Sequence, residues 1–193
     1  MLSSTVNFIA RELSSIYETS KKPEVLKAFS NKILSVKVPA INNQLQLYQV
    51  NGLASIQQEI YEEILQETDF NKFDEIMADI FQKRSFKPIR LEKLHIPKFT
   101  YKIPTVSLDI VRQLICGDIT SQNFRDYSRQ VLDGINDFEF KLCQYKRTVK
   151  TLIERYLNHL HEIYMNNYRN KDMKYESFRD YVKSYLEHVL EIQ

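Results

Sequence analysis

The sequence predicts a mainly α-helical protein, an antiparallel helical bundle with long C-terminal helices and a small two-stranded or extended basic segment in the middle. Two observations predict this class. Only three glycines and five prolines occur among 193 residues, so little in the sequence interrupts a helix. Apolar side chains recur every three or four residues through most of the chain, which is the spacing of one helix face.

The first forty residues predict two helices. Ser3 and Ser4 are suitable N-caps for a helix that runs to about Glu18. Pro23 fits the first turn of a second helix, because the N–H that proline lacks has no partner there in any case. Pro39 is expected to end this second helix.

A turn and a pair of short helices are expected next. Asn51-Gly52 is a dipeptide typical of turns. Residues 55–66 have helical spacing, and so does a segment that begins at Thr68 or Asp69 and runs to about Gln82. Because few residues connect these two segments, we expect them to pack as an antiparallel pair.

The central segment SFKPIRLEKLHIPKFTYKIP, residues 85–104, holds three of the five prolines and many basic residues. Its second half alternates between apolar and polar side chains, the period of an extended strand with one buried face. We expect two short strands or extended arms here, with the prolines at strand ends or edges. The apolar set is Phe99, Tyr101 and Ile103, and the polar set is Lys98, Thr100 and Lys102.

The C-terminal half predicts three further helices. Ser107 is an N-cap for a short helix that Gly117 ends. Residues 120–168 contain no proline and keep a spacing of threes and fours throughout, which predicts one long packed helix with a possible break at Gly134. A last helix is expected from Ser177.

These elements predict an N-terminal helical extension over 1–50 and a bundle core over 51–193, with the basic extended segment at 83–105. The N-terminus lacks the basic start of a signal peptide, and no run approaches the roughly 20 apolar residues of a membrane span. Neither secretion nor a membrane partner is therefore expected. Cys116 and Cys143 lack the spacing of a metal site and are expected to be reduced, buried thiols.

Enzyme signatures are scarce in this sequence. No glycine-rich phosphate loop occurs, and we expect no cofactor, metal or small-molecule substrate. Arg155 and His161, in RYLNHLH, resemble the loosely spaced Arg-to-His motif of the HEPN family of helical ribonucleases, in which a cation would lie beside a general acid or base. A charged, solvated helix face accounts for the same residues, so an enzyme is not the expected function.

Basic residues gather around the central segment, although the formal net charge of the chain is only +2. Cations with interleaved aromatic residues suit phosphate contact and base stacking. The competing interpretation, which has equal weight, is a solubilising linker. The candidate nucleic-acid-binding residues are Lys83, Arg84, Lys87, Arg90, Lys98, Lys102, Arg112, Arg125 and Arg129.

The stretch KFTYKIPTVSLDIVRQLICGDITSQNFR resembles the coat proteins of rod-shaped, tobacco mosaic virus-like plant viruses. That family has an aromatic strand, a helix rich in Leu, Asp and Val, and an Asp-Thr-Arg-like turn whose arginines hold RNA. KYESFRDY is similar to its C-terminal aromatic cluster, and the likeness spans about residues 53–180. The matching positions are Phe99, Tyr101, Leu108, Asp109, Val111, Leu114, Ile115, Asp118, Thr120 and Arg125.

The resemblance implies a structural coat subunit that assembles with copies of itself and packages nucleic acid, RNA in this family, through phosphate contacts without sequence choice. It would place the chain in a virion or in the host cytoplasm. The first fifty residues are extra, and the family's clustered arginines are reduced to Arg125 and Arg129. The alternative is a helical protein–protein interaction module that uses the seam of the long helix at Leu142, Val149 and Tyr156.

Overall fold

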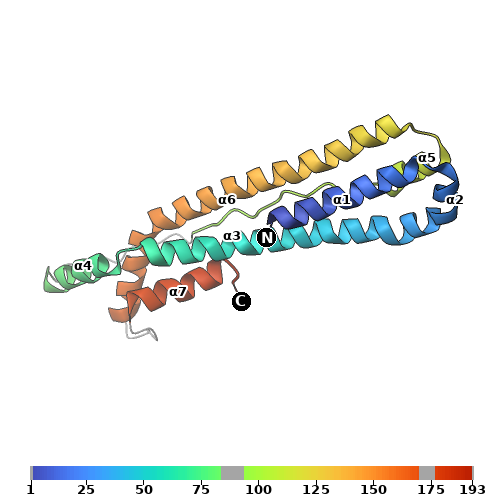
Figure 1. Ribbon diagram of the computed structural model, residues 1–193. Helices are drawn as coiled ribbons and strands as arrows, with labels where there is room; N and C mark the ends of the chain where they lie inside the picture. Colours follow the sequence, from blue (N-terminus) through green and yellow to red (C-terminus); the bar gives the residue numbers. More distant parts are fainter. Residues whose placement is uncertain (1, 84–93, 170–176, 193) are drawn as a thin grey trace. The chain divides into compact units, whose positions relative to one another are not determined.

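The computed structural model describes residues 2–83, 94–169 and 177–192, and these are mainly helical, as predicted (Figure 1). The chain divides into two compact units, which combine residues 1–53 with 100–142 and residues 54–99 with 143–193. The first fifty residues therefore belong to a unit with a later part of the chain, which differs from the expected boundary at residue 50. The helices are α1 (Leu2–Ser20), α2 (Pro23–Lys32), the π-helix η1 (Ile33–Lys37), α3 (Val38–Glu67), α4 (Phe70–Lys83), α5 (Leu108–Cys116), α6 (Ser121–Arg169) and α7 (Phe178–Val189).

The predicted break at Pro39 is wrong, because α2, η1 and α3 follow one another without a break. Pro23 begins α2 as expected. Pro39 lies in the first turn of α3, directly after the π-helical turn, where the N–H of Val38 bonds to the carbonyl of Ile33. This wider turn takes up one extra residue, so that Ile33 and Val38, five positions apart, are both buried.

The predicted turn at Asn51-Gly52 is also wrong, because α3 continues through it. Gly52 is buried, and a Cβ atom there would lie 3.2 Å from Leu142 and 3.3 Å from Phe138. The glycine therefore serves close packing between α3 and α6 and does not reverse the chain. As a result, residues 55–66 are the second half of a helix of 30 residues.

The expected antiparallel arrangement does not hold for α3 and α6, which run in the same direction within each unit (Figure 1). In the first unit, Tyr48 bonds to Glu139, and Gly52 faces Leu142. In the second unit, Lys146 and Lys150 of α6 pair with a series of glutamates that ascends along α3. Residue numbers rise together along both helices, as they do only in a parallel pair.

Residues 94–107 are extended but form no strand, so the predicted alternation is right and the predicted strands are not found in the described part of the segment. Ile103 is buried and Tyr101 half-buried, while Lys98 and Lys102 are exposed. In place of a partner strand, side chains of α3 bond to the backbone of the segment at Tyr101, Ile103 and Val106. The rest of the predicted basic segment, residues 84–93, lies outside the described residues.

Two amides of α3 supply those hydrogen bonds in the first unit. Gln49 donates to the carbonyl of Tyr101 (3.1 Å) and accepts from the N–H of Ile103 (3.0 Å). Asn42 donates to the carbonyl of Val106 (3.1 Å) and accepts from its N–H (2.7 Å). Each amide thus makes the two bonds that a neighbouring strand would make. The two are seven residues apart, on one face of α3.

Helix ends in the C-terminal half agree with the sequence. The Ser107 and Ser177 side chains accept from the N–H groups of Ile110 and Asp180, and Gly117 ends α5 in the left-handed conformation (φ 81°). Gly134 does not break α6, which extends over 49 residues. At the N-terminus the prediction is wrong, since Ser3 and Ser4 lie inside α1.

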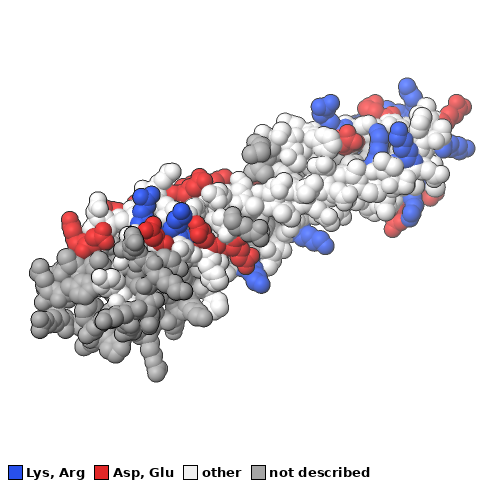
Figure 2. All heavy atoms as spheres, turned by 90° about the horizontal axis from the view of Figure 1, so that it is seen from below, with Lys and Arg blue, Asp and Glu red and all other residues white. Residues whose placement is uncertain are grey.

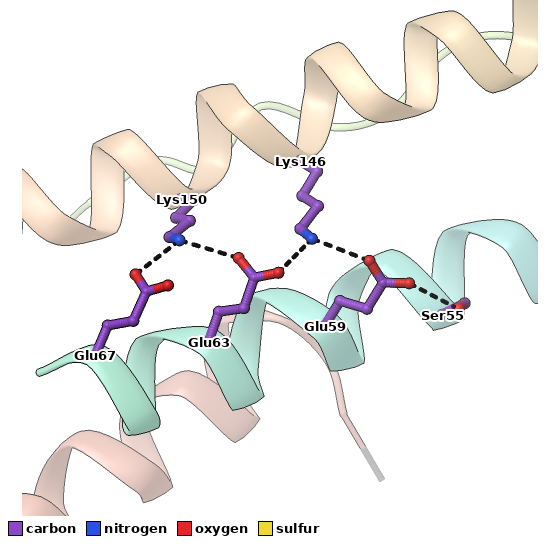
Figure 3. Close-up of polar contacts among 6 residues, drawn as sticks. All are labelled: Ser55, Glu59, Glu63, Glu67, Lys146 and Lys150. Carbon is purple, nitrogen blue, oxygen red and sulfur yellow. Dashed lines mark hydrogen bonds and ion pairs between the residues drawn. The ribbon is translucent and has the colours of Figure 1, made fainter.

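In the second unit, an alternating series of charges joins α3 to α6 (Figure 3). Lys146 lies 3.0 Å from Glu59 and 2.5 Å from Glu63, and Lys150 lies 3.0 Å from Glu63 and 2.8 Å from Glu67. Hydrogen bonds from the two lysines lower the pKa of Glu63. A shared network of this kind constrains the register of two helices more than single surface pairs do.

The second unit also contains an aromatic cluster around a buried histidine. His161, 3% exposed, lies against Phe73 of α4 and Phe178 of α7, with ring centroids 5.3 and 5.0 Å away. Tyr164 packs on the same Phe178 ring at 5.4 Å. Burial lowers the pKa of His161, against the opposing effects of a Phe73 backbone hydrogen bond and of the nearby Asp74 and Glu162 carboxylates.

Candidate nucleic-acid interface

The predicted basic residues fall into three groups. The Lys83 side chain, Arg84, Lys87 and Arg90 lie outside the described residues. Lys98 and Lys102 are exposed on the extended segment but belong to different units. Arg112 is exposed and pairs with Asp109 at 3.2 Å. Only Arg125 and Arg129, among the described candidates, are brought together around one surface feature.

That feature is a hollow of about 220 Å³ between α1 and α6, which we call the arginine hollow. Each helix lines it with four residues at positions i, i+3, i+4 and i+7, the spacing of a single helix face. Two of the eight are arginines, and none is a carboxylate. The lining residues are Ala10, Leu13, Ser14 and Tyr17 from α1, and Arg125, Ser128, Arg129 and Leu132 from α6.

Tyr17 organises the cations at this site. The Arg125 guanidinium carbon lies 4.8 Å from the centre of the Tyr17 ring, and the same guanidinium donates a hydrogen bond to the Tyr17 hydroxyl. Lys21, directly after the end of α1, places its ammonium 4.7 Å from the ring centre. Cations over an aromatic face are held without losing their charge. Arg125 is therefore pre-oriented but still positive.

The lining of the hollow carries two positive charges and no negative charge. Lys21 pairs with Glu18 at 2.8 Å, but that pair is well exposed. The Asp126 carboxylate accepts a hydrogen bond from Gln122 at 3.0 Å and does not line the hollow. Arg129 is exposed, and among the described residues it forms no ion pair. Two planar guanidinium groups that line one hollow suit the oxygens of a phosphate.

Sequence reasoning identified Arg125 and Arg129 but missed Tyr17 and Ser14. These α1 residues lie more than one hundred positions earlier in the chain, and nothing local in the sequence shows that the two helices meet there. The helical spacing of Ala10, Leu13 and Tyr17 was the available signal, yet it is equally consistent with an ordinary core-facing stripe.

Two of the three predicted interface residues of the long helix, Leu142 and Val149, lie in the chain's own core. Leu142 is 1% exposed and Val149 0% exposed. Tyr156 is half-buried and lies near Tyr185, with ring centroids 6.4 Å apart. Their regular spacing thus reflects internal packing, and Leu142 and Val149 are not on a surface that a partner could reach.

The residues of the HEPN-like motif do not share a surface either. Arg155 is exposed, whereas His161 is buried in the aromatic cluster. Six helical positions separate them, which places the side chains roughly 120° apart around α6. The Nε2 atom of His161 has no hydrogen-bond partner among the described residues.

The cysteine prediction is wrong in one respect, because Cys116 and Cys143 are both exposed. Both lie on helix faces that point away from their unit's core, where a free thiol needs no packing partner. Within the described residues, no group of His, Cys, Asp and Glu side chains is arranged to hold a metal ion. None of the described helices is both long and apolar enough to span a membrane.

Comparisons with models of protein families, with curated proteins and with solved structures found no match to this chain.

Proposed function

We propose that this protein is a structural subunit that coats nucleic acid, assembling with copies of itself and holding phosphates without reading sequence. The observation that carries the proposal is the arginine hollow, which Arg125, Arg129 and Tyr17 line with no carboxylate among the lining residues. Phosphate neutralisation by arginine supplies affinity for any sequence.

The direct test is binding of a fluorescein-labelled single-stranded RNA, followed by fluorescence anisotropy over a series of salt concentrations. We expect the double variant Arg125→Gln/Arg129→Gln to bind about tenfold or more weakly at low salt, since two charge-assisted contacts are lost. The slope of log K against log salt should fall by about 1.4, because each lost phosphate contact on a single strand contributes about 0.7.

The matched control is Arg155→Gln, an exposed arginine of the same helix in the other unit. It removes a charge from α6 but leaves the arginine hollow intact, so its affinity should match that of the wild type. Equal losses in the control and in the double variant would mean that general charge, and not this site, attracts RNA. No measurable RNA or DNA binding at low salt would overturn the proposal itself.

A second candidate function, a helical interaction module, is favoured by one observation. Large apolar side chains are exposed on η1 and α3, with Val36 55%, Leu47 52% and Val50 64% accessible. Such residues in a row mark contact surfaces. The two functions differ in their ligand: only the first requires nucleic acid. RNA affinity that depends on Arg125 and Arg129 would decide for the coat subunit.

A further inference from the structure

A stripe of uncharged side chains runs along the outer face of η1 and α3 in the first unit. Its five residues are spaced four, three, four and three apart, which is the seam of a two-stranded helical contact. All five are exposed, while the opposite face of α3 is buried at Val38, Ile41, Leu45 and Tyr48. The residues of this α3 stripe are Val36, Ala40, Asn43, Leu47 and Val50.

The stripe lies in an unusually neutral part of the chain. Residues 38–58 contain no Asp, Glu, Lys or Arg, although these make up 27% of the sequence. Figure 2, seen from the side on which α3 lies in Figure 1, shows a stretch of uncharged surface between the charged groups. Exposed helix faces normally carry charges for solubility, so a neutral and partly apolar one indicates a face that is covered in the working state.

We infer that the α3 stripe is the surface on which a second copy of this chain docks, stripe against stripe about a two-fold axis. This inference rests on the proposed function, for which it supplies a contact between subunits. In such a contact each copy presents the same patch, so the patch must complement itself.

Neutrality is what selects a second copy over other occupants. Two like-charged faces would repel each other, but this face has nothing to repel its own copy. A nucleic acid needs cations, and the stretch 38–58 has none.

The single polar member of the stripe fits the same occupant. The Asn43 amide carries both donors and an acceptor, so two Asn43 side chains can bond to each other when the seam closes. Ala40 is small and allows the two helices to approach closely. Asn43 is also central, seven residues from both Val36 and Val50. A two-fold axis that crosses the seam near Asn43 places Asn43 beside its own equivalent and Val36 beside Val50 of the second copy.

The size of the stripe predicts a weak pair. Fourteen helical steps from Val36 to Val50 span about 21 Å. A contact of this length buries roughly several hundred Å² on each copy. A standard stable interface buries about 800 Å² on each partner, so this contact is smaller. We therefore expect association at micromolar or higher concentrations for the isolated pair, strengthened when many subunits line one nucleic acid.

The test is sedimentation velocity of the nuclease-treated full chain from about 5 to about 500 μM, a range that brackets a weak dimer. The wild type should shift from monomer to dimer, and Leu47→Glu should stay monomeric. Phe140→Glu is the matched control, because Phe140 is 59% exposed on α6 of the same unit, outside the stripe. It should dimerise like the wild type.

A second measurement locates the axis. In a background with Cys116→Ser and Cys143→Ser, which removes both exposed thiols, Asn43→Cys should form a disulfide-linked dimer under mild oxidation. Phe140→Cys in the same background should form little. A mass that stays monomeric up to the highest concentration, or a dimer that Leu47→Glu leaves intact, would overturn the inference.

The salt dependence of dimerisation and that of RNA binding distinguish this inference from the proposed function. A neutral, partly apolar contact should hold or strengthen as salt rises, whereas phosphate binding should weaken steeply. A stripe-dependent dimer without RNA binding would leave the docking surface standing and remove the coat function. RNA binding with a dimer that forms elsewhere would do the reverse.

Discussion

Gly134 marks the point where the extended segment crosses α6. A Cβ atom at this position would lie 2.3 Å from Cγ and 2.8 Å from Cδ of Pro104, closer than such atoms can approach. The Tyr101 hydroxyl also donates to the Gly134 carbonyl at 2.9 Å. Glycine is thus required at this position because Pro104 leaves no room for a Cβ atom, and not because of its backbone conformation.

We predict that Gly134→Ala lowers the free energy of unfolding by about 1–3 kcal/mol, the usual cost of overpacking. Without the contact, the same change in a helix interior would stabilise by up to about 1 kcal/mol. Urea unfolding provides the measurement. In a Pro104→Ala background the clashing Cγ and Cδ atoms are gone, so Gly134→Ala should become neutral or stabilising there; an equal loss in both backgrounds would contradict the clash.

His161 makes the second unit sensitive to acid. Because burial lowers its pKa in the folded state, the unfolded chain takes up a proton first as pH falls through about 6.5. Stability is therefore full above that pH and declines below it, until the folded form protonates too. We expect the urea midpoint to fall between roughly pH 7 and pH 5 in the wild type.

The variant His161→Phe should flatten that decline, since the phenyl ring suits the cluster of Phe73, Tyr164 and Phe178 and does not titrate. His159 is exposed on the same helix and provides a control. If His159→Gln flattens the profile as much as His161→Phe does, the sensitivity does not come from the aromatic cluster.

At the scale of elements, the amides of α3 determine where the extended segment lies. Gln49→Leu removes two hydrogen bonds and leaves the Tyr101 carbonyl and the Ile103 N–H without those partners. The expected loss is about 1–3 kcal/mol, since unpaired half-buried groups are costly. Hydrogen exchange should show faster exchange of the Ile103 amide, with the Val106 amide, held by Asn42, less affected.

Gln46→Leu is the control for this prediction, because Gln46 is an exposed amide one turn earlier on α3. It should leave exchange at Ile103 unchanged. Equal protection of Ile103 in the wild type and in Gln49→Leu would show that the side-chain amide does not hold the segment.

Helices were predictable where the signal was local. The caps at Ser107 and Ser177, the stop at Gly117 and the length of α6 all follow from short patterns. The breaks predicted at Pro39 and at Asn51-Gly52 were wrong. The proline follows a π-helical turn inside a continuous helical stretch, and the glycine allows α3 to pack closely against α6. The π-helical turn is rare, and the packing partner of the glycine is distant in sequence, so helix propensity alone reveals neither.

Across the whole molecule, the burial and charge of individual residues were easier to predict than which residues lie close together in the fold. The alternation of buried and exposed residues over 98–103 was correct, but the partner of the segment was a helix and not a strand. Arg125 and Arg129 were named as candidates, whereas the Tyr17 ring that orients Arg125 depends on the packing of α1 against α6. Contacts between residues so far apart in sequence leave no pattern that a single sequence displays.

The parallel course of α3 and α6 has a consequence during synthesis of the chain. Their paired residues are 83 to 91 positions apart, as for Glu63 with Lys146 and Tyr48 with Glu139. At about 5–20 residues per second, α3 waits roughly 4–18 s for its partner to leave the ribosome. The buried side chains of α3 that meet α6 lack that cover for this interval, so we expect the nascent chain to expose an apolar helix face to chaperones before α6 is complete.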